Sequence, residues 1–260
     1  MSNVITQHMP IRFKESIYKW LIMIISTIII YIKQNKYKRI PIIINNFNHL
    51  SYLKRLIESL EKRGYFNIYI IDNKSTYPPL IEYYKNCPYT IFKLDCNIGY
   101  KAIWETEIYN KFKNSIYVYT DSDMEIDDSC PDDFIKHFID IMKKHPFSQK
   151  VGFGIRIDNL PDCFKNKEEV IKHESQFWIN EIEKNIYRAP IDTTFALYRP
   201  LCGGPADNNQ EVYRTGFPYV IKHLPWYMDS NNINEEEAFY IRTTSQSTHW
   251  TQKLKNQIKQ

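Results

Sequence analysis

Four short runs of apolar, β-branched and aromatic residues between positions 40 and 123 each end in polar side chains. The segments between them, such as residues 49–63, repeat apolar residues with the period of a helix. Strands that alternate with helices, without a hairpin signal between them, predict a mostly parallel sheet covered by helices on both faces. Ligands of such sheets bind beyond the carboxyl ends of the strands. The polar ends are Asn45–Asn46, Asp72–Asn73, Asn97 and Asp121–Asp123.

The fourth run, Ser115–Thr120, places two carboxylates at its carboxyl end. Residues i and i+2 of an extended segment point to the same side, so Asp121 and Asp123 can address one hard cation or one polar ligand. The acidic residues at 127–133 surround Pro131, a pattern typical of a capped helix start. We therefore expect those later carboxylates to be capping and solvated residues rather than ligands.

The second half of the chain gives weaker patterns. Beyond Lys150 we expect strands at 151–157 and 193–198, a helix at 168–178 and a loop at 201–209.

Composition limits the class of protein. The 260 residues can form one large domain, or one domain with a small appendage. The net charge of +4 is spread along the chain without a long basic block, so we expect no nucleic-acid partner. Five cysteines without a Cys-x-x-Cys pair argue against a disulfide framework and against a thiolate zinc site.

An apolar segment, Trp20–Ile32, lies between basic residues on both sides. It is shorter than the roughly 20 apolar residues that a comfortable membrane span needs. We expect an N-terminal apolar helix within residues 1–38 that is buried, forms a homodimer or associates with a membrane, and these alternatives stay open.

The ordered set of polar strand ends resembles the GT-A glycosyltransferases, especially family-2-like enzymes that use nucleotide-diphosphate sugars. The residues that carry the resemblance are Ile42–Asn46, Ile70–Thr76, Asn97–Gly99 and the Asp-x-Asp motif Asp121–Asp123. It covers residues 40–130 well and the remainder in outline. The resemblance implies an α/β, GT-A (Rossmann-like) fold.

The resemblance also implies a division of the chain. Residues 39–260 would form a single GT-A domain, with a nucleotide-binding half at 39–130 and an acceptor-binding half at 131–260.

On the donor side, the resemblance implies that Asp72 binds the uracil or ribose of a UDP-sugar. The other implied contacts to the donor come from Asn45, Asn97, Gly99, Lys101, Asp121, Arg214 and Lys222. For Asp72 the structural alternative is an Asx turn at the end of a strand.

The resemblance further implies a divalent cation, Mn²⁺ or Mg²⁺, that bridges the diphosphate oxygens. Asp121 and Asp123 would be ligands of this ion, because hard dications prefer carboxylate and phosphate oxygens. His223 is the predicted third ligand, and His249 competes for that role.

On the acceptor side an inverting enzyme needs a carboxylate base. Asp192 is the first candidate and Glu236 the second, while a retaining enzyme could dispense with a dedicated base. Sugar rings could stack on aromatic side chains. The candidates are Trp178, Tyr198, Trp226 and Tyr227.

The resemblance thus predicts a metal-dependent hexosyltransferase that moves glucose or galactose from a UDP-sugar to a saccharide or glycosylated-protein acceptor. Similar enzymes occur in bacterial surface-glycan clusters and in large AT-rich DNA viruses, and some glucosylate galactosyl-hydroxylysine of collagen-like chains. The abundance of Ile, Asn, Lys and Tyr is typical of an AT-rich coding genome, which favours a viral or bacterial origin. A cytoplasmic or membrane-associated location is also expected.

Two other functions stay open. One is a phosphatase or nucleotidyltransferase that uses Asp121 and Asp123, and the other is a non-catalytic carbohydrate-binding or scaffold protein.

Overall fold

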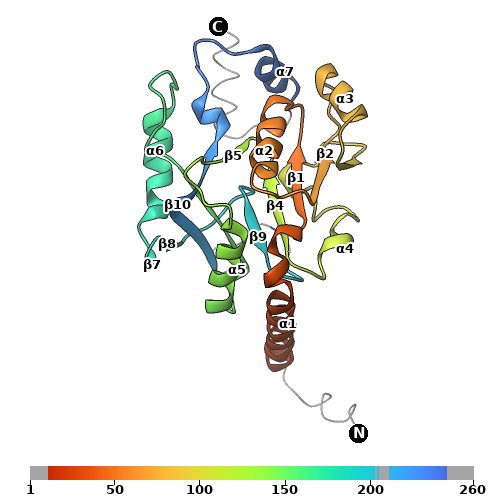
Figure 1. The fold of residues 1–260 in the computed structure, drawn as a ribbon, viewed down its shortest axis with the longest axis vertical. Coiled ribbons are helices and arrows are strands. Elements are labelled where there is room, and N and C mark those ends of the chain that lie inside the picture. Colours follow the sequence, from red (N-terminus) through yellow and green to blue (C-terminus); the bar gives the residue numbers. More distant parts are fainter. Residues whose placement is uncertain (1–10, 203, 205–210, 245–260) are drawn as a thin grey trace.

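The computed structural model describes residues 11–202, 204 and 211–244 of the chain. Within these residues ten strands form one central sheet with helices packed against it (Figure 1). The strands are β1 (Ile42–Asn46), β2 (Ile68–Asp72), β3 (Thr90–Lys93), β4 (Tyr117–Asp121), β5 (Met124–Ile126), β6 (Lys150–Ile155), β7 (Glu181–Glu183), β8 (Ile186–Arg188), β9 (Ala196–Tyr198) and β10 (Val212–His223).

The helical elements follow the same chain order. The α-helices are α1 (Ile11–Lys33), α2 (Ser51–Glu61), α3 (Pro78–Lys85), α4 (Tyr109–Phe112), α5 (Phe134–Lys144), α6 (Lys167–Ser175) and α7 (Glu235–Thr243). Short 3-10 helices are η1 (Gln34–Arg39), η2 (Gly99–Lys101), η3 (Gln176–Trp178) and η4 (Leu224–Tyr227).

The sheet is mixed, so the prediction of a mostly parallel sheet is wrong. Its order is β3-β2-β1-β4-β9-β6-β10-β8-β7, with β5 on β10. The first four strands are parallel, as expected. Strand β9 then runs antiparallel to both β4 and β6, and β7, β8 and β5 add further antiparallel pairs.

Two local features explain the antiparallel half. Strands β7 and β8 form a tight hairpin whose turn contains Asn185 at φ 59°, a left-handed conformation that asparagine tolerates. Strands β6 and β9 approach closely at Gly152, where an added Cβ would lie 2.4 Å from the Phe195 carbonyl oxygen. Glycine at this position therefore lets β9 enter the sheet between β4 and β6.

Strand β1 is buried on both faces, as a central strand must be when helices cover both sides. Ile42 and Ile44 belong to one buried cluster with Leu53 of α2 and Phe138 of α5. Ile43 belongs to a second buried cluster, which includes residues of α4. Each such side chain contributes about 1.5–3 kcal/mol of transfer free energy, so both clusters hold β1 in its register.

The ends of several predicted elements shift by a few residues. The helix expected at 49–63 is α2, and the helix expected at 168–178 is α6 followed by η3. The predicted capped start at 129–133 precedes α5, which begins only at Phe134. The N-cap residue Asp133 makes no side-chain capping bond. Most of the loop expected at 201–209 lies outside the described residues.

Helix α1 contains the apolar segment of residues 20–32 and lies at the end of the molecule away from α7 (Figure 1). Ser26 and Ile30 are buried against the domain. Arg199 donates to Ser26 Oγ at 3.2 Å and to Thr27 Oγ1 at 3.3 Å. Among the described helices, none combines the length and hydropathy that crossing a membrane requires. The dimer and membrane alternatives stay predictions.

Candidate functional site

Side chains at the carboxyl ends of β1, β2 and β4 form one hydrogen-bonded network. Asn45 Nδ2 donates to Asp121 Oδ1 at 3.1 Å and to the Gly99 carbonyl oxygen at 3.4 Å. Asn73, which directly follows β2, donates its Nδ2 to Asn45 Oδ1. The strand register brings these groups together, since Asn45 pairs with Asp121 across the β1–β4 ladder. Three of the predicted polar ends thus converge on one edge.

The turn at 97–99 joins the same network. Ile98 N donates to Asn73 Oδ1 at 3.1 Å, and Gly99 N donates to Asn97 Oδ1 at 2.9 Å. Gly99 has a φ of 79°, which glycine adopts without the steric cost that a side chain adds. The fourth predicted polar end therefore lies beside the other three.

Asp72 is buried at the end of β2. Its carboxylate accepts from Ser75 N at 3.3 and 3.4 Å and from the Tyr84 hydroxyl at 3.2 Å. Burial raises the pKa of Asp72 above its usual value, although these hydrogen bonds oppose the shift. Asp72 thus makes the turn contact of the structural alternative, and its role toward a nucleoside stays a prediction.

Asp121 is held from two sides. Asn45 donates to one carboxylate oxygen, and the Thr193 hydroxyl, from the segment before β9, donates to the other. Burial and the neighbouring charge of Asp123 raise the pKa of Asp121 to about 8, against the opposing effect of these hydrogen bonds. Two carboxylates that disfavour each other's charge form a site where a cation stabilises the ionised pair.

Asp123 faces His223, as the sequence interpretation requires. His223 Nε2 lies 3.3 Å from Asp123 Oδ2. The two meet because β10 pairs antiparallel with β5, which places His223 opposite Met124. Burial alone would raise the pKa of Asp123, but the charges of His223 and His49 outweigh it and lower that pKa. Burial lowers the pKa of His223, and Asp123 more than reverses this effect.

The residues present fit a divalent cation. Asp123 Oδ1 and His223 Nδ1 are buried and have no hydrogen-bond partner among the described residues. An unpaired carboxylate oxygen beside an imidazole suits a hard or borderline dication such as Mg²⁺ or Mn²⁺. No cluster of three or more His, Cys, Asp or Glu side chains within the described part of the chain is arranged to hold an ion. The predicted set of Asp121, Asp123 and His223 as metal ligands therefore stays a prediction.

The two candidate bases occupy different surroundings. Asp192 is exposed and precedes Thr193, whose carbonyl oxygen accepts from Asp121 N at 3.0 Å. Glu236 is buried and accepts from Leu50 N and Ser51 N at 2.8 Å, which caps the start of α2. Of the two candidate bases, Asp192 has its carboxylate open to solvent at the edge of the site.

The predicted diphosphate cations also differ. Lys101 is half-buried in η2 and its Nζ lies 3.9 Å from Glu105 Oε1. Lys222 lies 3.7 Å from Asp127. Arg214 is buried, forms a 2.8 Å ion pair with Glu174 and stacks on the Phe177 ring. Its charge is therefore paired inside the protein and does not face a ligand.

Of the four candidate stacking aromatics, Tyr198 is a core residue, fully buried and stacked on Tyr117. Trp226 is also buried, with its ring centroid 4.6 Å from that of His223. Tyr227 donates to Asn159 Oδ1 at 2.6 Å, and Trp178 packs against Tyr187. His249 lies outside the described residues.

Sequence reasoning placed Asn73 at a polar strand end without giving it a role, and it missed Thr193 and His49 as members of the site. Asn73 and Thr193 each adjoin a predicted residue, so the strand-end position was an available signal. His49 is buried 3.5 Å from Glu237, and no local pattern predicts that contact. Lys150 was also missed, because a lysine within an apolar strand looks like a surface residue. It is fully buried and donates to the Ile191 carbonyl oxygen at 2.6 Å.

The sequence matches no protein-family model and no curated protein. Its fold is similar to the crystal structure of S. aureus TarS 1–349, with a TM-score of 0.40 and 13% identity over 83% of this chain and 69% of that one. The crystal structure of S. aureus TarS gives a TM-score of 0.42 and 13% identity, over 83% of this chain and 42% of that one. The crystal structure of GalNAc-T7 with UDP, GalNAc and Mn²⁺ gives a TM-score of 0.46 and 14% identity, over 70% of this chain and 43% of that one. The chain thus spans less than half of the second and third structures. The identities and TM-scores are low, so the function proposed below rests on the residues of the site.

Proposed function

We propose that this protein is a metal-dependent glycosyltransferase that moves a hexose, glucose or galactose, from a UDP-sugar to a saccharide or glycosylated-protein acceptor. The observation that carries the proposal is the convergence of four motifs in one network at the carboxyl edge of the sheet. Nucleotides bind at this edge in open α/β sheets. The Asp-x-Asp motif lies within this network, and His223 Nε2 is 3.3 Å from Asp123 Oδ2.

The proposed chemistry needs a cation and a shaped polar edge. A divalent cation bound there would stabilise the negative charge that grows on the departing diphosphate. Asp123 and His223 are the residues proposed to hold it, with Asp121 beside them. Asn45, Asn73 and Gly99 would fix the geometry of this edge, with Asp72, Asn97, Lys101 and Lys222 proposed as further donor contacts.

The acceptor side is proposed to use Asp192 as a general base if the reaction inverts the anomeric carbon. Its support is its exposure next to Thr193, which contacts Asp121. Galactosyl-hydroxylysine of a collagen-like chain is one acceptor to test, together with free hexoses and oligosaccharides.

The proposal is tested by an assay of UDP release. The full chain is incubated with Mn²⁺ and either UDP-glucose, UDP-galactose or a UDP-N-acetylhexosamine, and free UDP is measured with and without acceptors. We expect slow hydrolysis of one UDP-hexose that Asp123→Ala abolishes. Asp140→Ala, which removes a half-buried carboxylate of α5 away from the candidate site, is the matched control and should keep the activity.

Two further measurements, phosphate release from simple phosphomonoesters and sugar binding, separate the rival functions. A phosphatase would release phosphate from simple phosphomonoesters and leave UDP-hexoses intact. A carbohydrate-binding or scaffold protein would release nothing, and Asp123→Ala would leave its sugar binding unchanged. Either result would contradict the proposal.

A further inference from the structure

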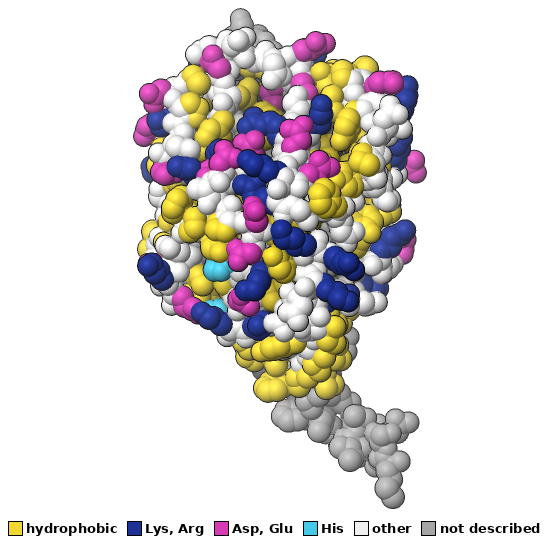
Figure 2. Space-filling view, viewed as in Figure 1, with side chains coloured by type: hydrophobic (Ala, Val, Ile, Leu, Met, Phe, Trp, Pro, Cys, Tyr) yellow, Lys and Arg dark blue, Asp and Glu magenta, His cyan; other side chains and the backbone are white. Residues whose placement is uncertain are grey.

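Helix α1 presents a continuous apolar stripe to solvent. The exposed residues recur at spacings of one, three and four along the helix, which places them on one face. They are Trp20, Leu21, Ile24, Ile25, Ile28, Tyr31 and Ile32. The opposite face carries the buried Ser26 and Ile30. Figure 2 shows apolar side chains gathered at the narrow end of the molecule, where α1 lies, with basic side chains above them.

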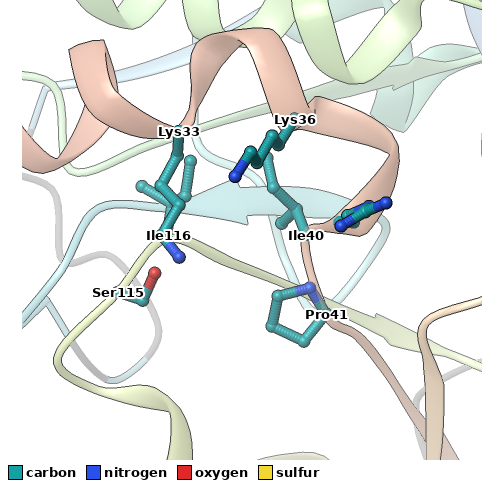
Figure 3. Close-up of a pocket in the computed structure, with 7 residues that line it drawn as sticks. Lys33, Lys36, Ile40, Pro41, Ser115 and Ile116 are labelled. Atoms are coloured by element: carbon teal, nitrogen blue, oxygen red, sulfur yellow. The ribbon is translucent and has the colours of Figure 1, made fainter.

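A basic pocket lies next to this stripe, where α1 meets the domain. It has a volume of about 260 Å³ and sits at the amino ends of β1 and β4, opposite the edge that holds the candidate site. Figure 3 shows Lys33 and Lys36 on its helical side and Pro41 and Ser115 facing them. Its lining residues are Lys33, Lys36, Arg39, Ile40, Pro41, Ser115 and Ile116.

The three cations of the pocket have no acidic partner among the side chains that the structure describes. Within the described part of the chain, no ion pair joins Lys33, Lys36 or Arg39 to a carboxylate. The sequence from Trp20 to Arg39 contains no Asp or Glu at all. An exposed apolar face beside an unpaired basic pocket calls for a ligand that is both apolar and anionic.

We propose that this end of the molecule docks on an anionic phospholipid surface. The apolar stripe of α1 enters the interfacial layer, and the pocket of Lys33, Lys36 and Arg39 receives a lipid phosphate. Trp20 and Tyr31 have amphipathic rings that favour this layer. A second copy of the chain fits less well, because the described side chains of the same face bring three more cations and no anion. The helix lies in the interface instead of crossing the bilayer.

Docking in this way fixes the orientation of the protein. The pocket is at the amino edge of β1 and β4, and the Asp-x-Asp motif is at their carboxyl edge. The candidate site therefore faces away from the lipid, so acceptors reach it from the aqueous side.

Vesicle flotation of the full chain tests the proposal. Vesicles of phosphatidylcholine alone are compared with vesicles that also contain phosphatidylglycerol, at low and high salt. We expect binding to the anionic vesicles that weakens with salt. Replacing all three pocket cations with Gln should weaken that binding about a hundredfold, since each cation near an anionic surface contributes about a factor of five. The triple variant is Lys33→Gln, Lys36→Gln and Arg39→Gln.

Two further variants complete the design. Ile25→Ser with Ile28→Ser, both at exposed positions, should reduce binding to anionic vesicles while circular dichroism stays unchanged. The matched control removes three exposed lysines elsewhere and should bind as the wild type does. Its substitutions are Lys111→Gln, Lys165→Gln and Lys172→Gln.

Three results would overturn the proposal. One is equal binding of the wild type to neutral and anionic vesicles, and another is full binding by the triple Gln variant. The third is an absence of vesicle binding together with a dimer in sedimentation that Ile25→Ser and Ile28→Ser dissociate, which would assign the stripe to a second copy.

Discussion

The two halves of the sheet build the candidate site in different ways. In the parallel half, β3-β2-β1-β4, consecutive strands end at one edge, and the ladders place Asn46 opposite Asp72 and Asn45 opposite Asp121. The mixed half, β9-β6-β10-β8-β7, contributes single residues from distant segments. Thr193 and His223 reach the Asp-x-Asp motif only because β9 and β10 fold back beside β4 and β5.

The two halves therefore have different roles in building the candidate site. The parallel half positions the polar side chains through its local strand-helix alternation. The mixed half completes their surroundings, and its contributions are therefore the sharper test of the proposed metal site. The predictions below probe the two halves in order of expected effect.

The largest effect is expected for Asp123→Asn at the end of the parallel half. Losing the central carboxylate should lower UDP-hexose turnover by about a thousandfold, the size of effect seen when one key electrostatic group of an active site is removed. Turnover with Mn²⁺ under saturating donor is the measurement. Thermal unfolding is the control, and a variant that folds normally and keeps its turnover would remove the motif from the mechanism.

A smaller loss is expected for His223→Ala in the mixed half. Mn²⁺ affinity should fall at least 10- to 100-fold, because that is the usual cost of losing a residue that only supports a metal ligand. Titration calorimetry of Mn²⁺ measures it, with the exposed His173→Ala as the matched control. Unchanged affinity would mean that the mixed half supplies no ligand.

Asp127 is expected to contribute to the stability of the fold rather than to catalysis. It follows β5, is almost fully buried, and accepts from Ser129 and from Arg156 at 2.8 Å. Burial opposes ionisation, but these contacts and Lys222 prevail and lower the pKa of Asp127 to about 2. Because the folded pKa lies below the unfolded value of about 3.9, the contribution is present above about pH 4 and is lost as the pH falls toward 2.

Asp127→Asn should therefore reduce the free energy of unfolding by about 2 kcal/mol at neutral pH, and the difference from wild type should shrink toward pH 2. Urea unfolding at several pH values measures this. A difference that does not depend on pH would contradict the assigned ion pair.

The smallest effect is expected for Glu236→Gln in α7. Its carboxylate caps α2, so the loss should be about 1 kcal/mol of stability with little change in turnover. The comparison variant, Asp192→Asn, belongs with the large effects above, because losing the general base of an inverting enzyme should lower turnover about 100-fold or more. If Glu236→Gln abolishes turnover in a stable protein, the roles of the two carboxylates are reversed.

The sequence predicts the parallel half well because its signals are local. Apolar runs such as Ile42–Ile44 and Ile68–Ile71 mark strands, and the polar residues directly after them lie at the site. The mixed half follows from pairings between residues far apart in the chain. The three-residue strand β9 carries too little pattern to reveal that it enters between β4 and β6.

The same contrast holds within the site. The position of Asp121 and Asp123 at the sheet edge is predictable from their place after a strand, whereas the choice of His223 over His249 comes from the family resemblance, and its role as a ligand stays a prediction. The contact of Thr193 with Asp121, the burial of Lys150 and the capping role of Glu236 depend on the tertiary fold, which no local spacing encodes.

The most direct test of the account is calorimetric titration of UDP into the full chain with and without Mn²⁺, for the wild type and for Asp123→Ala. We predict that the wild type binds UDP in the presence of Mn²⁺ and far more weakly without it, and that Asp123→Ala loses the dependence on the metal. Absence of metal-dependent UDP binding in the wild type would contradict the proposed site.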